Sequence, residues 1–111
     1  MKINSKDIES IEQLKNKIDA NLHTHFSIEE LASDAGMGTT KFKYLFRRLY
    51  DMGVFHYIQE RRMSQATELL TNSDEPIKRI ATIAGFQYVS NFTNAFKKKF
   101  GITPLEYRNK R

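Results

Sequence analysis

The chain of 111 residues carries one apolar pattern twice, and this duplication constrains the fold more than any other feature. The spacing Ile-x-x-Leu-Ala-x-x-Ala-Gly over residues 28–36 returns as Ile-x-x-Ile-Ala-x-x-Ala-Gly over residues 77–85. Each glycine is followed by two phenylalanines four residues apart, Phe42 and Phe46 in the first copy and Phe92 and Phe96 in the second. Apolar residues at this spacing predict amphipathic helices, and the glycine between them allows a tight turn.

A helix, a glycine turn and a second helix make a helix-turn-helix, whose second helix fits the major groove of DNA. A single match is weak, because any helical hairpin can carry alanine and glycine at these positions. Two matches in register on one basic chain favour two DNA-binding units over a helical bundle that binds no nucleic acid.

Apolar residues keep helical spacing along nearly the whole chain, and no segment sustains the alternation of a strand. The first expected helix carries an apolar stripe from Ile8 to Leu22, the second covers 28–35 after a Ser27–Glu30 capping box, and the third starts at Thr39 or Thr40 and buries Phe42, Leu45, Phe46 and Leu49 before Gly53 breaks the pattern. A longer helix runs from Val54 to Thr71, and the next has Pro76 at its first position. The last two are a helix with a stripe from Phe92 to Phe100, ended by Gly101, and a short helix that begins with a Thr103–Glu106 capping box. The fold class is therefore all-α, with about seven helices.

The helices divide into a helix-turn-helix subdomain over residues 1–52, a linker helix over 53–72 and a second helix-turn-helix subdomain over 73–111. A linker of about 18 residues spans roughly 27 Å. With the width of the subdomains added, the two recognition helices can lie in adjacent major grooves, which are about 34 Å apart on one face of DNA.

The charge of the chain is segregated along the sequence. The formal net charge is +5, but residues 1–40 carry a net −3 and residues 41–111 a net +8. Clustered cations neutralise phosphates and release counterions, so this distribution favours a polyanionic partner more than the net charge alone does.

Composition and motifs exclude several other classes. Cysteine is absent, which removes disulfides, thiolate metal sites and a cysteine nucleophile. His23 and His25 lack partners at metal-ligand spacing and fit helix C-capping better. We find no acid, base or nucleophile cluster, and therefore expect no enzyme activity, no metal and no cofactor. No apolar run approaches the ~18 residues of a membrane span, and no signal peptide is visible, so we expect a cytoplasmic protein.

The second copy also carries a set of residues at recognisable spacing: Ile77, Ile80-Ala81, Gly85-Phe86, Phe92, Phe96-Lys97, Gly101, Thr103-Pro104 and Tyr107-Arg108. With this set the chain resembles the AraC/XylS family of bacterial transcription regulators over about residues 7–109. The segment Arg62-Met63 with Ala66 and Leu69-Leu70 is similar to the central linker helix of that family. The resemblance implies two helix-turn-helix subdomains that bind DNA as one unit.

Positions outside the apolar stripe of each second helix are the candidates for DNA contact. They are Thr39, Thr40, Lys43, Tyr44 and Arg47 in the first copy, and Val89, Ser90, Thr93, Asn94, Lys97 and Lys98 in the second. The resemblance places the base contacts at much the same positions, around Phe42 and Phe92.

The side-chain chemistry divides these candidates by role. Lys43 suits guanine, Asn94 suits adenine, and Tyr44 and Val89 suit a thymine methyl, while Ser90 and Thr93 serve either type of base. Arg47, Lys97, Lys98 and Lys99 are better phosphate contacts. At least one of the lysines at 97–99 should point away from DNA, because three consecutive residues span most of the circumference of a helix.

These observations predict sequence-specific binding of double-stranded DNA in bacterial transcription regulation. The alternative is a helical interaction module that contacts the transcription machinery, such as RNA polymerase, without reading DNA. Several members of the family carry an N-terminal sensor or dimerisation domain. This chain is therefore either a small stand-alone regulator or a C-terminal fragment, and we expect the fragment, from which that domain is missing. Arg61 and Arg62 have two interpretations, a phosphate contact or pairing with Glu30 or Asp34, and Arg62 resembles a packing arginine of the family.

Overall fold

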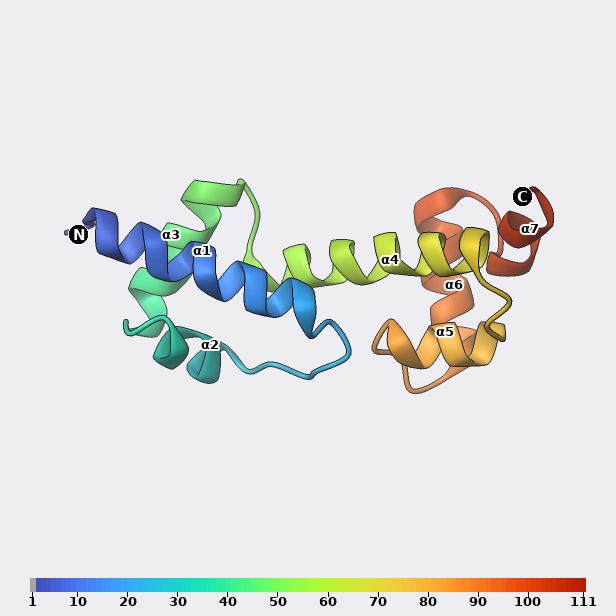
Figure 1. The fold of residues 1–111 in the computed structure, drawn as a ribbon, viewed down its shortest axis with the longest axis horizontal. Helices are drawn as coiled ribbons and strands as arrows, with labels where there is room; N and C mark the ends of the chain where they lie inside the picture. Colours follow the sequence, from blue (N-terminus) through green and yellow to red (C-terminus); the bar gives the residue numbers. More distant parts are fainter. Residues whose placement is uncertain (1) are drawn as a thin grey trace. The chain divides into compact units, whose positions relative to one another are not determined.

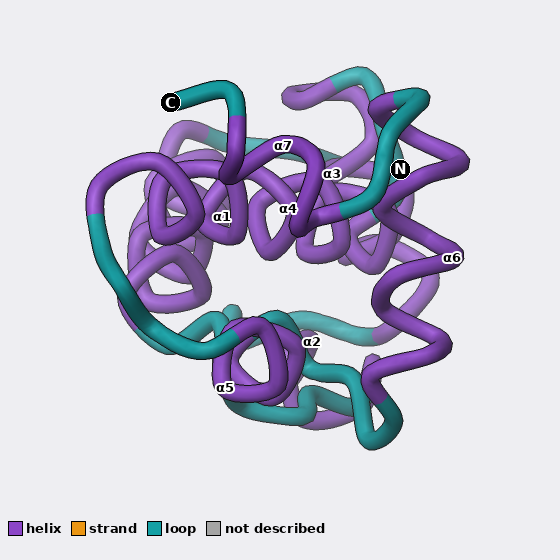
Figure 2. Tube along the Cα trace, turned by 90° about the vertical axis from the view of Figure 1, so that its right-hand side faces the viewer, coloured by secondary structure: helices purple, strands orange, loops and turns teal. Residues whose placement is uncertain are grey.

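The computed structural model describes residues 2–111, and this part of the chain contains seven α-helices and no strand. Figure 1 follows the helices in order, and Figure 2 shows only helix and loop along the trace. The helices are α1 (Ser5–Ala20), α2 (Ile28–Asp34), α3 (Thr39–Tyr50), α4 (Val54–Asn72), α5 (Ile77–Ile83), α6 (Val89–Phe100) and α7 (Pro104–Asn109). The predicted all-α fold is confirmed.

The chain folds as two units, residues 1–58 and residues 59–111, each with its own core. The helix α4 supplies residues to both cores, Val54 and Ile58 to the first and Met63, Ala66 and Leu70 to the second. None of the helices at residues 2–111 is both long enough and apolar enough to cross a membrane.

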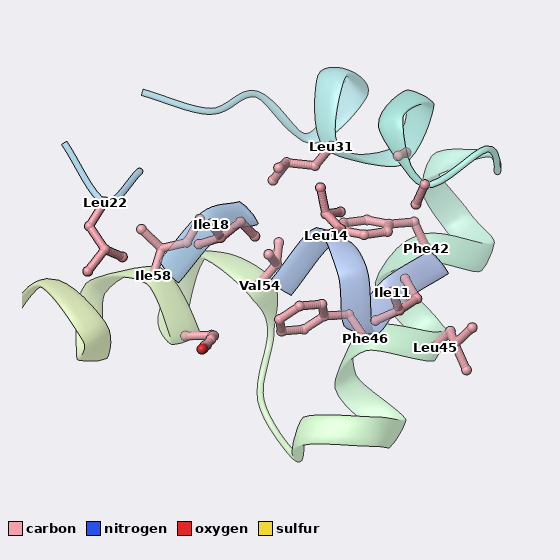
Figure 3. Close-up of a cluster of buried hydrophobic side chains, with 13 residues drawn as sticks. Ile11, Leu14, Ile18, Leu22, Leu31, Phe42, Leu45, Phe46, Val54 and Ile58 are labelled. Atoms are coloured by element: carbon pink, nitrogen blue, oxygen red, sulfur yellow. The ribbon is translucent and has the colours of Figure 1, made fainter. Parts of the chain in front are cut away.

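The first core is built around two phenylalanines of α3 that are completely buried. Figure 3 shows Phe42 and Phe46 beside Leu14 and Ile11 of α1, and Leu31 of α2 closes the cluster. The helix α3 is held here because its apolar residues recur every three to four positions and form one stripe. Truncating either phenylalanine to alanine would cost about 3–5 kcal/mol, as is usual for a buried aromatic ring.

The second core repeats this arrangement with the matching residues of the second copy. Phe92 and Phe96 of α6 are completely buried, and their ring centroids lie 5.8 Å apart, against 6.0 Å for the pair in α3. The ring of Tyr107 in α7 packs edge-on to Phe96 at 5.5 Å, and its counterpart in the first copy is Tyr57 of α4, whose ring lies 5.6 Å from that of Phe46. The sequence duplication therefore corresponds to a duplicated core.

The ends of some helices differ from expectation. The first helix ends at Ala20, so Leu22 is buried beyond its end and is not part of the helical stripe. It begins with an Asn4–Asp7 capping box that the sequence analysis did not identify. Pro76 is the N-cap of α5 and not its first helical residue.

Two capping predictions have different outcomes. The Thr103–Glu106 capping box is complete, with each side chain bonded to the backbone N–H of the other residue. At α2 the Ser27 hydroxyl accepts the Glu30 N–H as expected, but it donates to the Glu30 carboxylate at 3.1 Å. The reciprocal bond to the backbone of Ser27, which would complete a capping box, is replaced by this side-chain contact.

Candidate nucleic-acid interface

The turn that positions each recognition helix has the same hydrogen-bonded geometry in both copies. In the first, the N–H of Met37 donates to Ala32 O at 3.0 Å and the N–H of Gly36 to Ser33 O at 2.9 Å. In the second, the matching bonds are Phe86 to Ala81 at 2.9 Å and Gly85 to Thr82 at 3.0 Å. Both are Schellman motifs, in which the residue after the C-cap adopts a positive φ, and here φ is +71° at Gly36 and +85° at Gly85.

The far ends of the two recognition helices are also equivalent, but not through the residues expected. The C-cap of α6 is Gly101 with φ +84°, whereas the C-cap of α3 is Asp51 with φ +60°, two residues before Gly53. Each of these residues donates its N–H to the carbonyl four residues earlier, Asp51 at 2.8 Å and Gly101 at 2.7 Å. Asp51 thus occupies the position that corresponds to Gly101, because aspartate is one of the few residues besides glycine that tolerate this conformation.

Burial of the phenylalanines leaves one polar face of each recognition helix in solvent. In α3 this face holds Thr40, Lys43, Tyr44 and Arg47 as exposed residues and Thr39 as a half-buried one. In α6 it holds Ser90, Asn94, Lys97 and Lys98 as exposed residues and Val89 and Thr93 as half-buried ones. Each set of candidate contact residues is therefore gathered on one helix, and none of its members is fully buried. Their contact with DNA stays a prediction.

Ion pairing separates the basic residues into two groups. Within the described residues, no ion pair involves the side chains of Lys43, Arg47, Lys97 or Lys98. By contrast, Lys41 at the start of α3 bonds Asp7 at 2.8 Å, and Lys99 reaches both carboxylate oxygens of Glu60 at 2.6 and 2.7 Å. Lys99 is therefore the one of the three consecutive lysines that is held by α4. The cations on the candidate faces remain available to an anionic partner.

The second copy has a close contact that the first lacks. A Cβ atom placed on Gly85 would lie 2.9 Å from the guanidinium carbon of Arg62, whereas nothing lies within 4 Å of the same atom on Gly36. Arg62 is half-buried, and this burial lowers the pKa of its guanidinium. Asp34, one of the two acids with which the sequence suggested that Arg62 could pair, accepts a hydrogen bond from Lys17 at 3.0 Å. The position of Arg62 against the turn before α6 supports the packing interpretation.

Two large aromatic residues near the recognition helices are exposed to solvent. Phe55, at the start of α4, is 49% exposed and lines a hollow of about 320 Å³ together with Lys43 and Arg47 of α3. Tyr88 is 59% exposed and directly precedes α6. Phe55 lies outside the apolar stripe of its helix, and this is the one sequence signal that marks it as exposed.

The part of the chain that the structure describes holds no group of three or more metal-binding side chains. His23 and His25 follow the end of α1 at Ala20, in the loop before α2.

Comparison with known proteins connects this geometry to a family. A family described as a helix-turn-helix domain matches residues 31–110. Among curated proteins, the HTH-type transcriptional regulator ExsA of Pseudomonas aeruginosa is 36% identical over 98 residues, which are 88% of this chain and 35% of that protein. The virulence regulon transcriptional activator VirF of Yersinia enterocolitica is 36% identical over 97 residues, 87% of this chain and 36% of that protein.

Two solved structures share the fold. The DNA-binding domain of AdpA, described as a global transcriptional factor and solved with a target DNA, matches with a TM-score of 0.83 and 27% identity over 90% of both chains. An AraC-type regulator from Chromobacterium violaceum matches with a TM-score of 0.82 and 24% identity over 96% of this chain and 95% of that chain. The chain spans about a third of the length of the curated relatives named above.

Proposed function

The chain belongs to the AraC/XylS-type family of helix-turn-helix domains, and from this premise we propose that it binds double-stranded DNA sequence-specifically and regulates bacterial transcription. The observation that carries the proposal is the pair of matched turns, each followed by a helix with a buried phenylalanine stripe and an exposed polar face. The AdpA structure, which contains a target DNA, supports the same partner.

The two faces have different chemistry and therefore different proposed roles. On α3, Lys43 donates to guanine and Tyr44 contacts a thymine methyl. On α6, Asn94 forms two hydrogen bonds with adenine, and Ser90 contributes a hydroxyl that accepts or donates. Each good two-bond contact is worth about 1–3 kcal/mol of discrimination between bases.

The remaining candidates are assigned to supporting contacts: Thr39, Thr40, Thr93 and Val89 to the base edges beside them, and Arg47, Lys97 and Lys98 to phosphates. We place α3 and α6 in successive major grooves, so that one chain covers two adjacent half-sites. Phosphate contacts of this kind add affinity without adding sequence information.

A selection from randomised duplexes, followed by binding measurements on the selected site, tests the proposal. Lys43→Ala and Asn94→Ala should each weaken binding to the selected site about 5- to 150-fold and relax the preference at one base position. Lys97→Ala is the matched control, since it removes a phosphate contact and should weaken selected and random duplexes equally. Equal loss on all sequences for Lys43→Ala and Asn94→Ala would refute base reading, and no binding to any duplex at low salt would favour the protein-interaction alternative.

The whole regulator is also proposed to contain more than this unit. The curated relatives are about three times as long as the part that matches, which supports a fused N-terminal sensor or dimerisation domain. We also propose that the regulator contacts RNA polymerase and acts in the cytoplasm. The relatives named above are a transcriptional regulator and a transcriptional activator, which supports a binding function and not a catalytic one.

A further inference from the structure

The first helices of the two copies carry opposite charges at the same positions. In α2 the two residues after the leading isoleucine are Glu29 and Glu30, and in α5 they are Lys78 and Arg79. The register between the copies is fixed by the identical turns that follow, so these pairs occupy equivalent places. All four side chains are exposed.

Local helix stability does not explain the basic pair. Acidic residues in the first turn are favourable because the N-terminus of a helix carries a partial positive charge, and cations there are unfavourable. The helix α2 follows this rule, with Glu29 and Glu30 in its first turn, as do α1 and α7. The helix α5 has no acid in its first turn and no side-chain cap. Lys78 and Arg79 therefore oppose the field of their own helix.

The basic pair is also not engaged within its unit. Other cations of residues 59–111 are held internally, since Lys99 bonds Glu60, Arg111 bonds Asp74 at 2.6 Å, and Arg108 donates to the carbonyls of Leu69, Leu70 and Ser73. No ion pair within the described residues involves Lys78 or Arg79.

The two acidic residues that lie nearest in the sequence form no ion pair with Lys78 or Arg79. Asp74 is paired with Arg111, and Glu75 is half-buried before the helix begins. The ammonium and guanidinium groups are thus left in solvent, as are those on the face of α6.

In a helix-turn-helix bound to DNA, the first helix crosses the sugar-phosphate backbone. From the charge inversion we infer that α5 is a phosphate-binding face, on which Lys78 and Arg79 each neutralise one DNA phosphate, whereas α2 makes no such contact. This inference rests on the proposed function and deepens it, because it divides the electrostatic binding unequally between two subdomains of the same architecture.

The salt dependence of binding to a random-sequence duplex tests the inference directly. Each neutralised phosphate contributes about 0.9 to the slope of log affinity against log salt. The variant K78Q/R79Q should therefore lose about 1.8 from the slope, and its affinity should weaken about 12-fold less than that of the unchanged chain between 50 and 200 mM salt. Binding at low salt should weaken equally on random duplexes and on a selected site.

Three controls separate this contact from other effects. K2Q/K6Q removes the same net charge from two exposed residues of the first unit and should keep the slope within about half of one phosphate. E29Q/E30Q alters the mirrored positions of α2 and should also leave the slope unchanged. K78R/R79K retains both charges and should retain the slope.

The urea midpoint of K78Q/R79Q should be equal to or slightly above that of the unchanged chain, because two cations leave the first turn of a helix. This combination of unchanged or higher stability with a lower slope is not expected of residues that only support the fold. An unchanged slope in K78Q/R79Q, or an equal loss in K2Q/K6Q, would overturn the inference while leaving DNA binding intact. Absence of duplex binding by the unchanged chain would instead overturn the proposed function.

Discussion

The two glycines that end the first helix of each copy give a matched pair of substitutions, Gly36→Ala and Gly85→Ala. Both place an alanine at a positive φ, which costs about 1–2 kcal/mol because the Cβ atom crowds the following carbonyl. At Gly36 this is the whole cost, since a Cβ there has no neighbour within 4 Å. At Gly85 the Cβ must also displace the guanidinium of Arg62 from 2.9 Å, and because this is the flexible end of a side chain the added cost is that of a strained rotamer, about 0.5–1.5 kcal/mol.

We therefore expect a free energy of unfolding lower by about 1–2 kcal/mol for Gly36→Ala and by about 1.5–3.5 kcal/mol for Gly85→Ala. Urea titrations followed by residue-resolved NMR report the two units separately, so each loss can be assigned to its own unit. Repeating Gly85→Ala in an Arg62→Ala background closes a double-mutant cycle, in which the excess over Gly36→Ala should disappear. Equal costs for the two alanines, or an excess that persists without Arg62, would show that the contact has no energetic effect.

Two further predictions concern single contacts. Lys99→Gln should change the slope of log DNA affinity against log salt by less than half as much as Lys98→Gln, because Lys99 is neutralised by the carboxylate of Glu60 in its own unit. Anisotropy titrations at several salt concentrations measure this slope, and equal changes for the two variants would contradict the prediction. The pKa values of Tyr57 and of Tyr50 beside it are raised, mainly because both side chains are buried in the folded unit. Their contribution to the stability of the first unit should therefore be complete below about pH 10, the ordinary pKa of tyrosine, and should be lost as the pH rises through the raised pKa values. Tyr57→Phe should lower the free energy of unfolding by about 1 kcal/mol at pH 7, because it removes the hydrogen bond to Asp19. It should also make the loss of stability at alkaline pH shallower, as measured by urea midpoints between pH 7 and 11. An equally steep loss would show that Tyr57 is not its source.

The duplicated architecture could be predicted because its signals are local. The spacing of Phe42, Phe46, Phe92 and Phe96 indicates which side of each recognition helix is buried, and hence which side remains exposed. Once the buried side is assigned, helical geometry gives the exposed residues without further information.

Features that depend on tertiary contact were not predictable in the same way. Lys99 and Glu60 are 39 residues apart, and nothing in the sequence singles out this lysine from its two neighbours. The sequence predicts that Gly53 breaks the pattern of α3, whereas in the structure the residue of positive φ after this helix is Asp51. The opposite charges at the start of α2 and α5 are visible in the sequence. The structure adds that the turns after the two helices are equivalent, so that the charged residues occupy corresponding positions.

The two turns hold chemically different reading faces, and this gives the proposed target a direction. A symmetric dimer reads a palindrome, which looks the same from either end. With the proposed contacts, one chain that has lysine and tyrosine on α3 but hydroxyl and amide groups on α6 would require two unlike half-sites in a fixed order. Reversing the order of the half-sites would abolish the match although every base pair is retained, so a bound chain would distinguish upstream from downstream without a second subunit.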